Sequence, residues 1–138
     1  MLEGMISQSR LKELSLRDGA KVFYRKWEGA KQGDVIVYLH GLESHIEWFI
    51  NIATLLNRKG FHIYGMDRRG SGLNKADRGH MESYWILVGD VREAVELARR
   101  EHPDRKIYLM GLCWGGKIAA TFAAYHHDLI DGLVLPLL

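Results

Sequence analysis

A seven-residue stretch, "GLCWGGK" at residues 111–117, has a spacing that fits two kinds of chemistry. Read as Gly-x-Cys-x-Gly, it is typical of the strand-to-helix turn that presents a catalytic nucleophile, here Cys113. Read as Gly-x-x-x-x-Gly-Lys, it contains most of a phosphate-binding loop. Such a loop needs Ser or Thr after its Lys to hold magnesium, but Ile118 follows here, and Trp114 is bulky where small residues are needed. The nucleophile interpretation is therefore favoured.

Cys113 has a glycine two residues before it, Gly111, and another two residues after it, Gly115. Glycines at this spacing allow a very tight turn, which lifts the central side chain to the N-terminus of the next helix. The positive end of that helix favours the thiolate, which is the reactive form of cysteine. The alternative is an ordinary buried cysteine, since free cysteines are often buried. The spacing favours a nucleophile over that alternative.

The segments around this turn alternate between strand patterns and helix patterns. Strands are predicted at residues 34–41, 61–67, 106–111 and 131–138, helices at 44–60, 82–103 and 115–127, and a hairpin at 10–29. This order predicts an α/β fold, a mainly parallel sheet with helices on both faces and an N-terminal β-hairpin. Ligands bind beyond the C-terminal ends of such strands, where the turn at Cys113 lies.

Several local patterns make these predictions specific. The run from Val35 to Leu39 is continuously apolar, as expected of a strand covered on both faces. Asp18-Gly19 predicts a two-residue hairpin turn, and Ser44 and Glu47 have the spacing of a capping box. One helix is predicted to bury Phe49, Ile52, Ala53 and Leu56, and another to bury Tyr84, Leu87, Val88, Val91, Val95 and Ala98.

Length and composition limit the class of protein. The 138 residues are enough for one domain, 1–138, and 47% apolar residues are enough for a packed core. The net charge of +2 is too small to predict a nucleic-acid partner. A single cysteine excludes an internal disulfide and fits a reducing compartment, and there is no apolar run of signal-peptide or transmembrane length, so we expect a cytoplasmic protein. We expect no cofactor and no metal site, since no pair of histidines is placed on a helix face like metal ligands.

Three motifs in order, "YLHGLESHIEWF", "GMDRRGSGLN" and "LMGLCWGGKIAA", resemble the α/β-hydrolase superfamily, above all its lysophospholipase and monoacylglycerol-lipase-like branch. The resemblance covers nearly the whole chain. It implies that Cys113 is the nucleophile and that the backbone N–H groups of Leu42 and Trp114 form the oxyanion hole. Supporting roles are implied for His40, Gly41, Gly111 and Gly115 around the site, and for Asp67 and Gly70 in the turn after the fourth strand.

The sequence departs from that family at two points. The elbow residue of this branch is normally Ser; Cys occurs in the dienelactone-hydrolase branch, so both a natural thiol enzyme and an engineered Ser-to-Cys change are open. The family order also places an acid and a histidine after the nucleophile, but only His126 and His127 follow Cys113. They lie 13 residues or more along a helix, roughly 20 Å away, whereas a base must be within about 3 Å of its proton. The remaining candidate bases are His40 and His45.

We therefore expect the N-terminal portion of a carboxylic ester hydrolase, truncated after its sixth strand, without the lid and C-terminal strands. The substrate implied by the resemblance is a small-molecule ester or lipid, such as a monoacylglycerol or lysophospholipid. Activity of this chain alone is expected to be impaired or absent. The alternative is a non-catalytic, hydrolase-like binding or interaction module. The apolar end "DGLVLPLL" predicts self-association or strand swapping through an exposed final strand.

Overall fold

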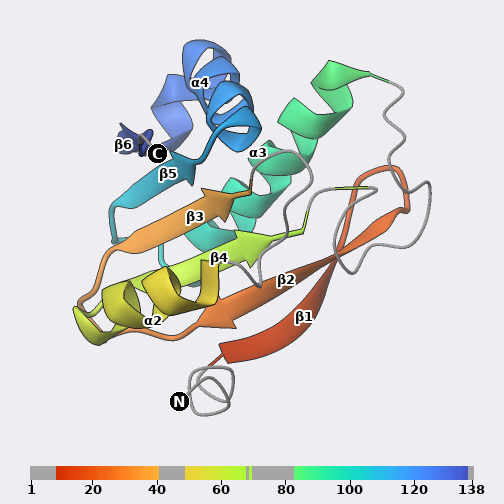
Figure 1. The fold of residues 1–138 in the computed structure, drawn as a ribbon. Coiled ribbons are helices and arrows are strands. Elements are labelled where there is room, and N and C mark those ends of the chain that lie inside the picture. Colours follow the sequence, from red (N-terminus) through yellow and green to blue (C-terminus); the bar gives the residue numbers. More distant parts are fainter. Residues whose placement is uncertain (1–8, 41–48, 68, 70–82, 137–138) are drawn as a thin grey trace.

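The computed structural model describes residues 9–40, 49–67, 69 and 83–136. Within them, six strands form one sheet in the order β1-β2-β4-β3-β5-β6 (Figure 1). The strands are β1 Ser9–Ser15, β2 Lys21–Trp27, β3 Val35–Leu39, β4 His62–Met66, β5 Ile107–Gly111 and β6 Gly132–Val134. Strands β4, β3, β5 and β6 run parallel, while β1 and β2 form a hairpin that joins β4 in antiparallel fashion. The predicted fold class is confirmed.

Helices cover both faces of the sheet, α2 Ile50–Arg58 on one face and α3 Tyr84–Glu101 with α4 Trp114–His126 on the other (Figure 1). A short 3₁₀ turn, η2 His127–Leu129, follows α4. Alternate residues of β3 divide between the two faces: Val35, Val37 and Leu39 pack with α3 and α4, and Ile36 and Tyr38 pack with α2. Every residue of β3 is buried, which explains its continuously apolar sequence.

Helix α3 provides most of the apolar cover on its face of the sheet. Ser83 caps its N-terminus by accepting a hydrogen bond from the N–H of Trp85 at 3.2 Å. The predicted stripe is confirmed, with Tyr84 packed at its edge and its remaining members buried. Burying an aliphatic side chain contributes about 1.5–3 kcal/mol, so this stripe fixes the helix firmly on the sheet.

Helix α2 differs from the prediction at one residue. Phe49 and Ala53 are buried and Leu56 is partly buried, as expected, but Ile52 is 54% exposed. The inward face is set by Ile50 and its neighbours one turn on, and a position two residues after Ile50 lies about 200° around the helix. The proposed capping residues, Ser44 and Glu47, lie outside the described residues.

The hairpin between β1 and β2 is confirmed, but its turn has three residues rather than two. Leu16 donates its N–H to the carbonyl of Ala20 at 2.7 Å, and Gly19 donates its own to the carbonyl of Leu16 at 2.9 Å. Gly19 has φ +86, so the glycine closes the loop after an ordinary turn instead of sitting inside a two-residue turn. The Asp18 carboxylate accepts the N–H of Ala20 at 3.1 Å and stabilises this form.

Strand β6 pairs only with β5 in the part of the chain that the structure describes. Its apolar residues are partly exposed to solvent, with Leu133 38% and Val134 37% exposed, and so is Leu135, which follows it and is 46% exposed. The expected exposed apolar edge is therefore present, and its self-association stays a prediction. Among the described residues, no helix is both long and apolar enough to cross a membrane.

Candidate functional site

Cys113 occupies the tight turn between β5, which ends at Gly111, and α4, which begins at Trp114. Its backbone has φ 53 and ψ −117, and it is the one non-glycine residue with positive φ among those described. Such a conformation costs about 1–3 kcal/mol and persists only where the surrounding structure enforces it. The thiol is exposed. The turn therefore holds a reactive type of side chain out to solvent beyond the C-terminal end of a strand, as predicted.

The two flanking glycines are required because backbone packs directly on backbone. A Cβ atom on Gly111 would lie 2.3 Å from the carbonyl oxygen of Gly115. A Cβ atom on Gly115 would lie 2.3 Å from the carbonyl oxygen of Leu39 and 2.5 Å from that of His40. The turn is also hydrogen-bonded, since Leu112 donates its N–H to the carbonyl of Leu39 at 3.3 Å. Any larger residue would push α4 away from β3 and β5.

Trp114, the expected oxyanion donor, is the first residue of α4. The N–H groups of a first helical turn point out of the helix N-terminus, and here they do so beside Cys113. The Trp114 side chain packs against the main apolar core. The hydroxyl of Tyr84 bonds Thr121 at 2.8 Å and the carbonyl of Lys117 at 3.1 Å, which holds α4 against α3.

His40 directly follows β3 and is completely buried. Its carbonyl group lies against Gly115, so its backbone forms one wall of the turn that holds Cys113. The expected neighbours Gly41 and Leu42, and the alternative base His45, lie outside the described residues. The structure thus brings His40 to the turn through its backbone.

The histidines after Cys113 are placed as predicted. His126 is the last residue of α4, and its ring packs on Phe122 with ring centroids 5.1 Å apart. His127 begins η2 and is exposed. The thirteen residues of α4 span roughly 20 Å at 1.5 Å per residue, so neither ring reaches the thiol.

Tyr38 on β3 is electrostatically coupled to Cys113, although its position in an apolar run predicts only a core residue. Burial raises the pKa of its phenol, and negative charge on Cys113 raises that pKa further. The Tyr38 ring stacks on Phe49 with centroids 3.7 Å apart and planes 5° apart. This stack joins β3 to Phe49, the residue that precedes α2.

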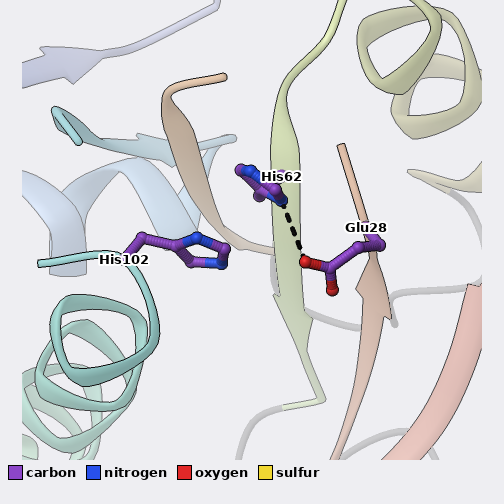
Figure 2. Close-up of side chains that lie close together, drawn as sticks. All are labelled: Glu28, His62 and His102. Carbon is purple, nitrogen blue, oxygen red and sulfur yellow. Dashed lines mark ion pairs between the residues drawn. The ribbon is translucent and has the colours of Figure 1, made fainter. Parts of the chain in front are cut away.

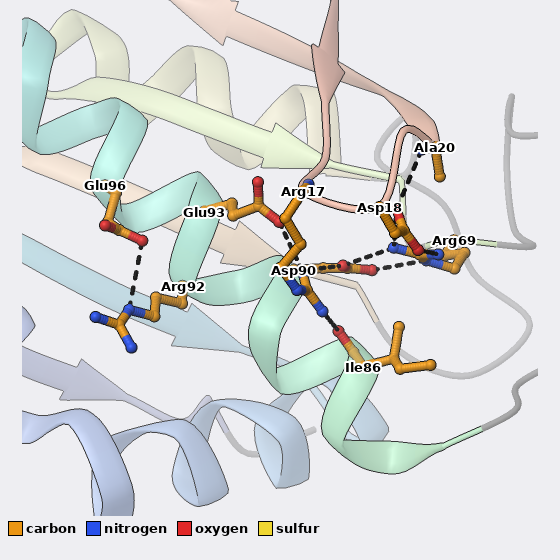
Figure 3. A network of polar contacts seen from close by, with 9 residues as sticks. All are labelled: Arg17, Asp18, Ala20, Arg69, Ile86, Asp90, Arg92, Glu93 and Glu96. Carbon is orange, nitrogen blue, oxygen red and sulfur yellow. Dashed lines mark hydrogen bonds and ion pairs between the residues drawn. The ribbon is translucent and has the colours of Figure 1, made fainter.

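An ion-pair network supports the segment after β4, next to the same end of the sheet (Figure 3). Asp90 on α3 is 5% exposed and accepts hydrogen bonds from Arg69 at 2.9 and 3.0 Å and from Arg17 at 3.0 Å. Arg69 also contacts Asp18 at 2.6 Å, and this hydrogen bond lowers the pKa of Asp18 to about 2. The pKa of Arg69 is raised, first by its hydrogen bond with Asp90.

This network joins the hairpin turn, the end of β4 and α3. Arg69 belongs to the "DRRGSG" stretch, and its buried neighbour Asp67 donates its N–H to the carbonyl of Phe23 at 3.1 Å. The sequence motif marks a turn, but nothing in it identifies Asp90 as the partner of Arg69.

A second group of chemically active side chains lies at the opposite end of the parallel strands. Glu28, His62 and His102 each place one potential metal-binding atom within 4.8 Å of the others (Figure 2). The expectation of no metal site did not anticipate this group, because no histidine pair on a helix face marks it in the sequence. These residues come from a strand end, a strand start and a helix end that are distant in the sequence.

Comparisons with known proteins identify the family of the chain. The family model described as "Serine aminopeptidase, S33" matches residues 30–136. Monoglyceride lipase from Mus musculus is 26% identical over 119 residues, or 86% of this chain and 39% of the relative. Epoxide hydrolase B from Mycobacterium tuberculosis is 34% identical over 107 residues, or 75% of this chain and 28% of the relative.

The fold is also shared with solved structures. An alpha/beta hydrolase from Penicillium sp. sh18 superposes with a TM-score of 0.80 at 21% identity, over 92% of this chain and 45% of that one. The resemblance to α/β-hydrolases is confirmed. The chain spans less than half the length of each of these three proteins.

Proposed function

Because the chain belongs to the family described as serine aminopeptidase, S33, we propose that it forms part of a carboxylic ester hydrolase with Cys113 as nucleophile. The observation that carries this proposal is the backbone of Cys113, held at φ 53 by close glycine packing with its thiol exposed. A strained residue that the fold enforces and exposes points to chemistry at that residue rather than to packing. The N-terminus of α4 would further favour negative charge on its sulfur.

In the proposed reaction, the Cys113 thiolate attacks the ester carbonyl carbon and a C–S bond forms. The carbonyl oxygen becomes an oxyanion, which accepts hydrogen bonds from the N–H groups of Trp114 and Leu42. One such donor contributes about 3–4 kcal/mol to acyl transfer. The C–O bond then breaks, and the alcohol leaves with a proton. Water hydrolyses the thioester, which releases the acid and restores the thiol.

The proton transfers need a base that the described residues do not bring to Cys113. His126 and His127 are too far along α4, and His40 is buried with its backbone in the wall of the turn. We assign the acid and the histidine to sequence outside these 138 residues. Turnover by this chain alone should therefore be very weak or absent, although one round of acylation remains chemically accessible to an exposed thiolate.

The proposed substrate class rests on the match to monoglyceride lipase, which is longer than the match to epoxide hydrolase B. We propose a fatty acyl ester, such as a monoacylglycerol or a lysophospholipid. A nucleophilic cysteine must stay reduced to act, which favours the cytoplasm as its compartment.

The direct test is acylation of the purified chain by p-nitrophenyl butyrate, followed by intact mass and peptide mapping. We expect one butyryl group per chain, located on Cys113, with little release of further p-nitrophenol. The Cys113→Ala variant should take up none. Repeated turnover that is lost in Cys113→Ala would show that a base within this chain completes the reaction, and His40→Ala and His45→Ala would identify it. A folded protein without any adduct on Cys113 would contradict the proposal.

A second candidate is a non-catalytic, hydrolase-like binding module. The observation that favours it is a cysteine at the position of the nucleophile in a family described as serine aminopeptidase. A site arranged to deprotonate a hydroxyl need not suit a larger sulfur. Saturable binding of a monoacylglycerol ether, whose ether bond cannot be hydrolysed, without acylation by the activated ester would favour this module over the enzyme.

A further inference from the structure

The cluster formed by Glu28, His62 and His102 joins three separate elements. Glu28 directly follows β2, His62 is the first residue of β4, and His102 is the C-terminal cap of α3 (Figure 2). One side-chain ligand atom from each lies within 4.8 Å of the other two. These residues gather at the N-terminal ends of the parallel strands, at the opposite end of the sheet from Cys113.

Each of the two imidazole rings has a buried nitrogen without a hydrogen-bond partner among the described residues. His62 is 3% exposed, and its Nδ1 accepts the N–H of Gly29 at 2.8 Å, so the proton of the neutral ring lies on Nε2. Within the described part of the chain, neither His62 Nε2 nor His102 Nε2 has a hydrogen-bond partner. Burying a polar atom without a partner is costly, so such a pair calls for an explanation.

Simple stacking of two imidazoles accounts for only part of this arrangement. The His62 and His102 rings are 3.9 Å apart between centroids and tilted by 30°. Stacking satisfies no ring nitrogen, and it does not explain the third group. A carboxylate oxygen of Glu28 lies 3.4 Å from His62 Nδ1, which brings negative charge to the two rings. Two imidazoles and one carboxylate are a donor set typical of zinc.

We propose that Glu28, His62 and His102 form a binding site for a divalent transition-metal ion of the zinc class. Ligand atoms about 2.0–2.1 Å from a tetrahedral ion lie about 3.4 Å from one another, so the observed separations need to shorten only modestly. Glu28 has room to move, because its side chain is 65% exposed. A fourth position is left for water. The ion would join the ends of β2, β4 and α3 without involving the nucleophile turn.

Lys26 competes with the metal for the same carboxylate. Its ammonium group lies 3.2 Å from Glu28 and 2.8 Å from Glu101, and it also lies over the Tyr64 ring. Metal binding would take Glu28 from Lys26 and leave Lys26 paired with Glu101. Removing this cation should therefore tighten metal binding, because it removes both a competitor and a repulsive charge.

The test uses the 138-residue chain with Zn²⁺ in isothermal titration calorimetry and with Co²⁺ in visible absorption. We expect saturable binding of one ion, with Co²⁺ bands of a site built from nitrogen and oxygen ligands. His102→Gln and Glu28→Gln should each weaken binding by more than about tenfold, since even loss of an outer partner of a metal ligand costs 10- to 100-fold. Lys26→Met should strengthen it.

The matched control is the double variant His126→Gln/His127→Gln, which removes two adjacent histidines at the C-terminal end of α4, outside the cluster. It should leave the affinity unchanged. Loss of binding in this control but not in His102→Gln would place the metal elsewhere and overturn the proposal. The same holds if the wild-type chain, folded by circular dichroism, binds neither ion in a saturable way. The variants change the exposed Glu28 and the partly buried His102, so misfolding through the buried His62 does not confuse the result.

Discussion

The two ends of the parallel strands build their chemistry from different materials. At the C-terminal end, the backbone does the positioning: glycines bring β3, β5 and α4 into contact, and Cys113 is held at φ 53 with its thiol exposed. At the N-terminal end, glycine backbone also packs closely, with Gly29 against Gly60, but the chemistry comes from side chains, whose buried imidazole nitrogens lack hydrogen-bond partners among the described residues. The first arrangement presents one atom to a ligand from outside, whereas the second surrounds a point between three side chains.

This difference has a consequence for stability. The turn at Cys113 tolerates almost no added volume at its glycines, because the atoms in contact are backbone atoms that cannot move independently. In the cluster at the other end, the Glu28 side chain is 65% exposed, so its carboxylate can move to contact a small ligand. Substitutions at the turn should therefore lower the stability of the whole fold. Substitutions of the cluster side chains should mainly change the affinity for a ligand.

The largest effect is expected for Gly115→Ala. Its new Cβ would lie 2.3 Å from the carbonyl oxygen of Leu39, so the free energy of unfolding should fall by about 3 kcal/mol. The control is Gly19→Ala, where φ is +86 but no atom lies within 4 Å of the new Cβ. That change should cost only about 1 kcal/mol. Urea denaturation measures both, and equal losses would show that the close contact at Gly115 is not the cause.

The next largest effect tests the support of the same end by α3. Asp90→Ala leaves Arg17 and Arg69 without their shared carboxylate and should cost about 2 kcal/mol. This is below the 3–5 kcal/mol typical of fully buried pairs, since both arginines are partly exposed. Glu96→Ala removes an exposed pair with Arg92 on the same helix (Figure 3) and should cost less than about 0.5 kcal/mol. Similar costs in denaturation would show that the network is dispensable.

A smaller effect of opposite sign tests the strain at Cys113. Cys113→Gly removes the Cβ from a residue with φ 53, whereas Cys113→Ala keeps it. The glycine variant should be more stable than the alanine variant by about 1 kcal/mol, although glycine normally destabilises a structured position. Thermal unfolding compares the two variants directly. An alanine variant at least as stable as the glycine variant would mean that the turn stores no strain.

The smallest effect concerns pH. The hydrogen bond from Arg69 lowers the pKa of Asp18 from 3.8 to about 2 in the folded protein. This carboxylate therefore stabilises the fold above pH 3.8, and its contribution is lost as the pH falls toward 2. Asp18→Asn should flatten the dependence of the unfolding free energy on pH within that window only. A flattening centred near neutral pH would point to a different group.

The fold was largely predictable from the sequence because its signals are local. The apolar run of β3 and the helical stripe of α3 each lie within one continuous segment, and both are confirmed. The failures occur where several arrangements share one pattern. Asp18-Gly19 suits both two-residue and three-residue turns, and Ile52 fits an inward stripe only until the start of α2 is fixed at Ile50.

The sites divide in the same way. The turn around Cys113 is formed by seven consecutive residues, so the residue types and the spacing of the glycines were enough to predict its position. Glu28, His62 and His102 are separated by tens of residues, and only the pairing of the strands brings them together. Arg69 and Asp90 meet for the same reason. The electrostatic coupling of Tyr38 to Cys113 could not be predicted, because Tyr38 belongs to the apolar run of β3 and is expected to be a core residue.

The central claim is that the fold turns Cys113 into a nucleophile, and its alkylation rate tests this most directly. Iodoacetamide is applied at neutral pH to the folded chain and to a peptide with the sequence of residues 109–117, which has the same thiol and neighbours but no fold. The account predicts that Cys113 reacts at least about tenfold faster in the folded chain, because the helix N-terminus and the exposed turn favour a reactive thiolate. A folded chain that reacts no faster than the peptide would contradict it.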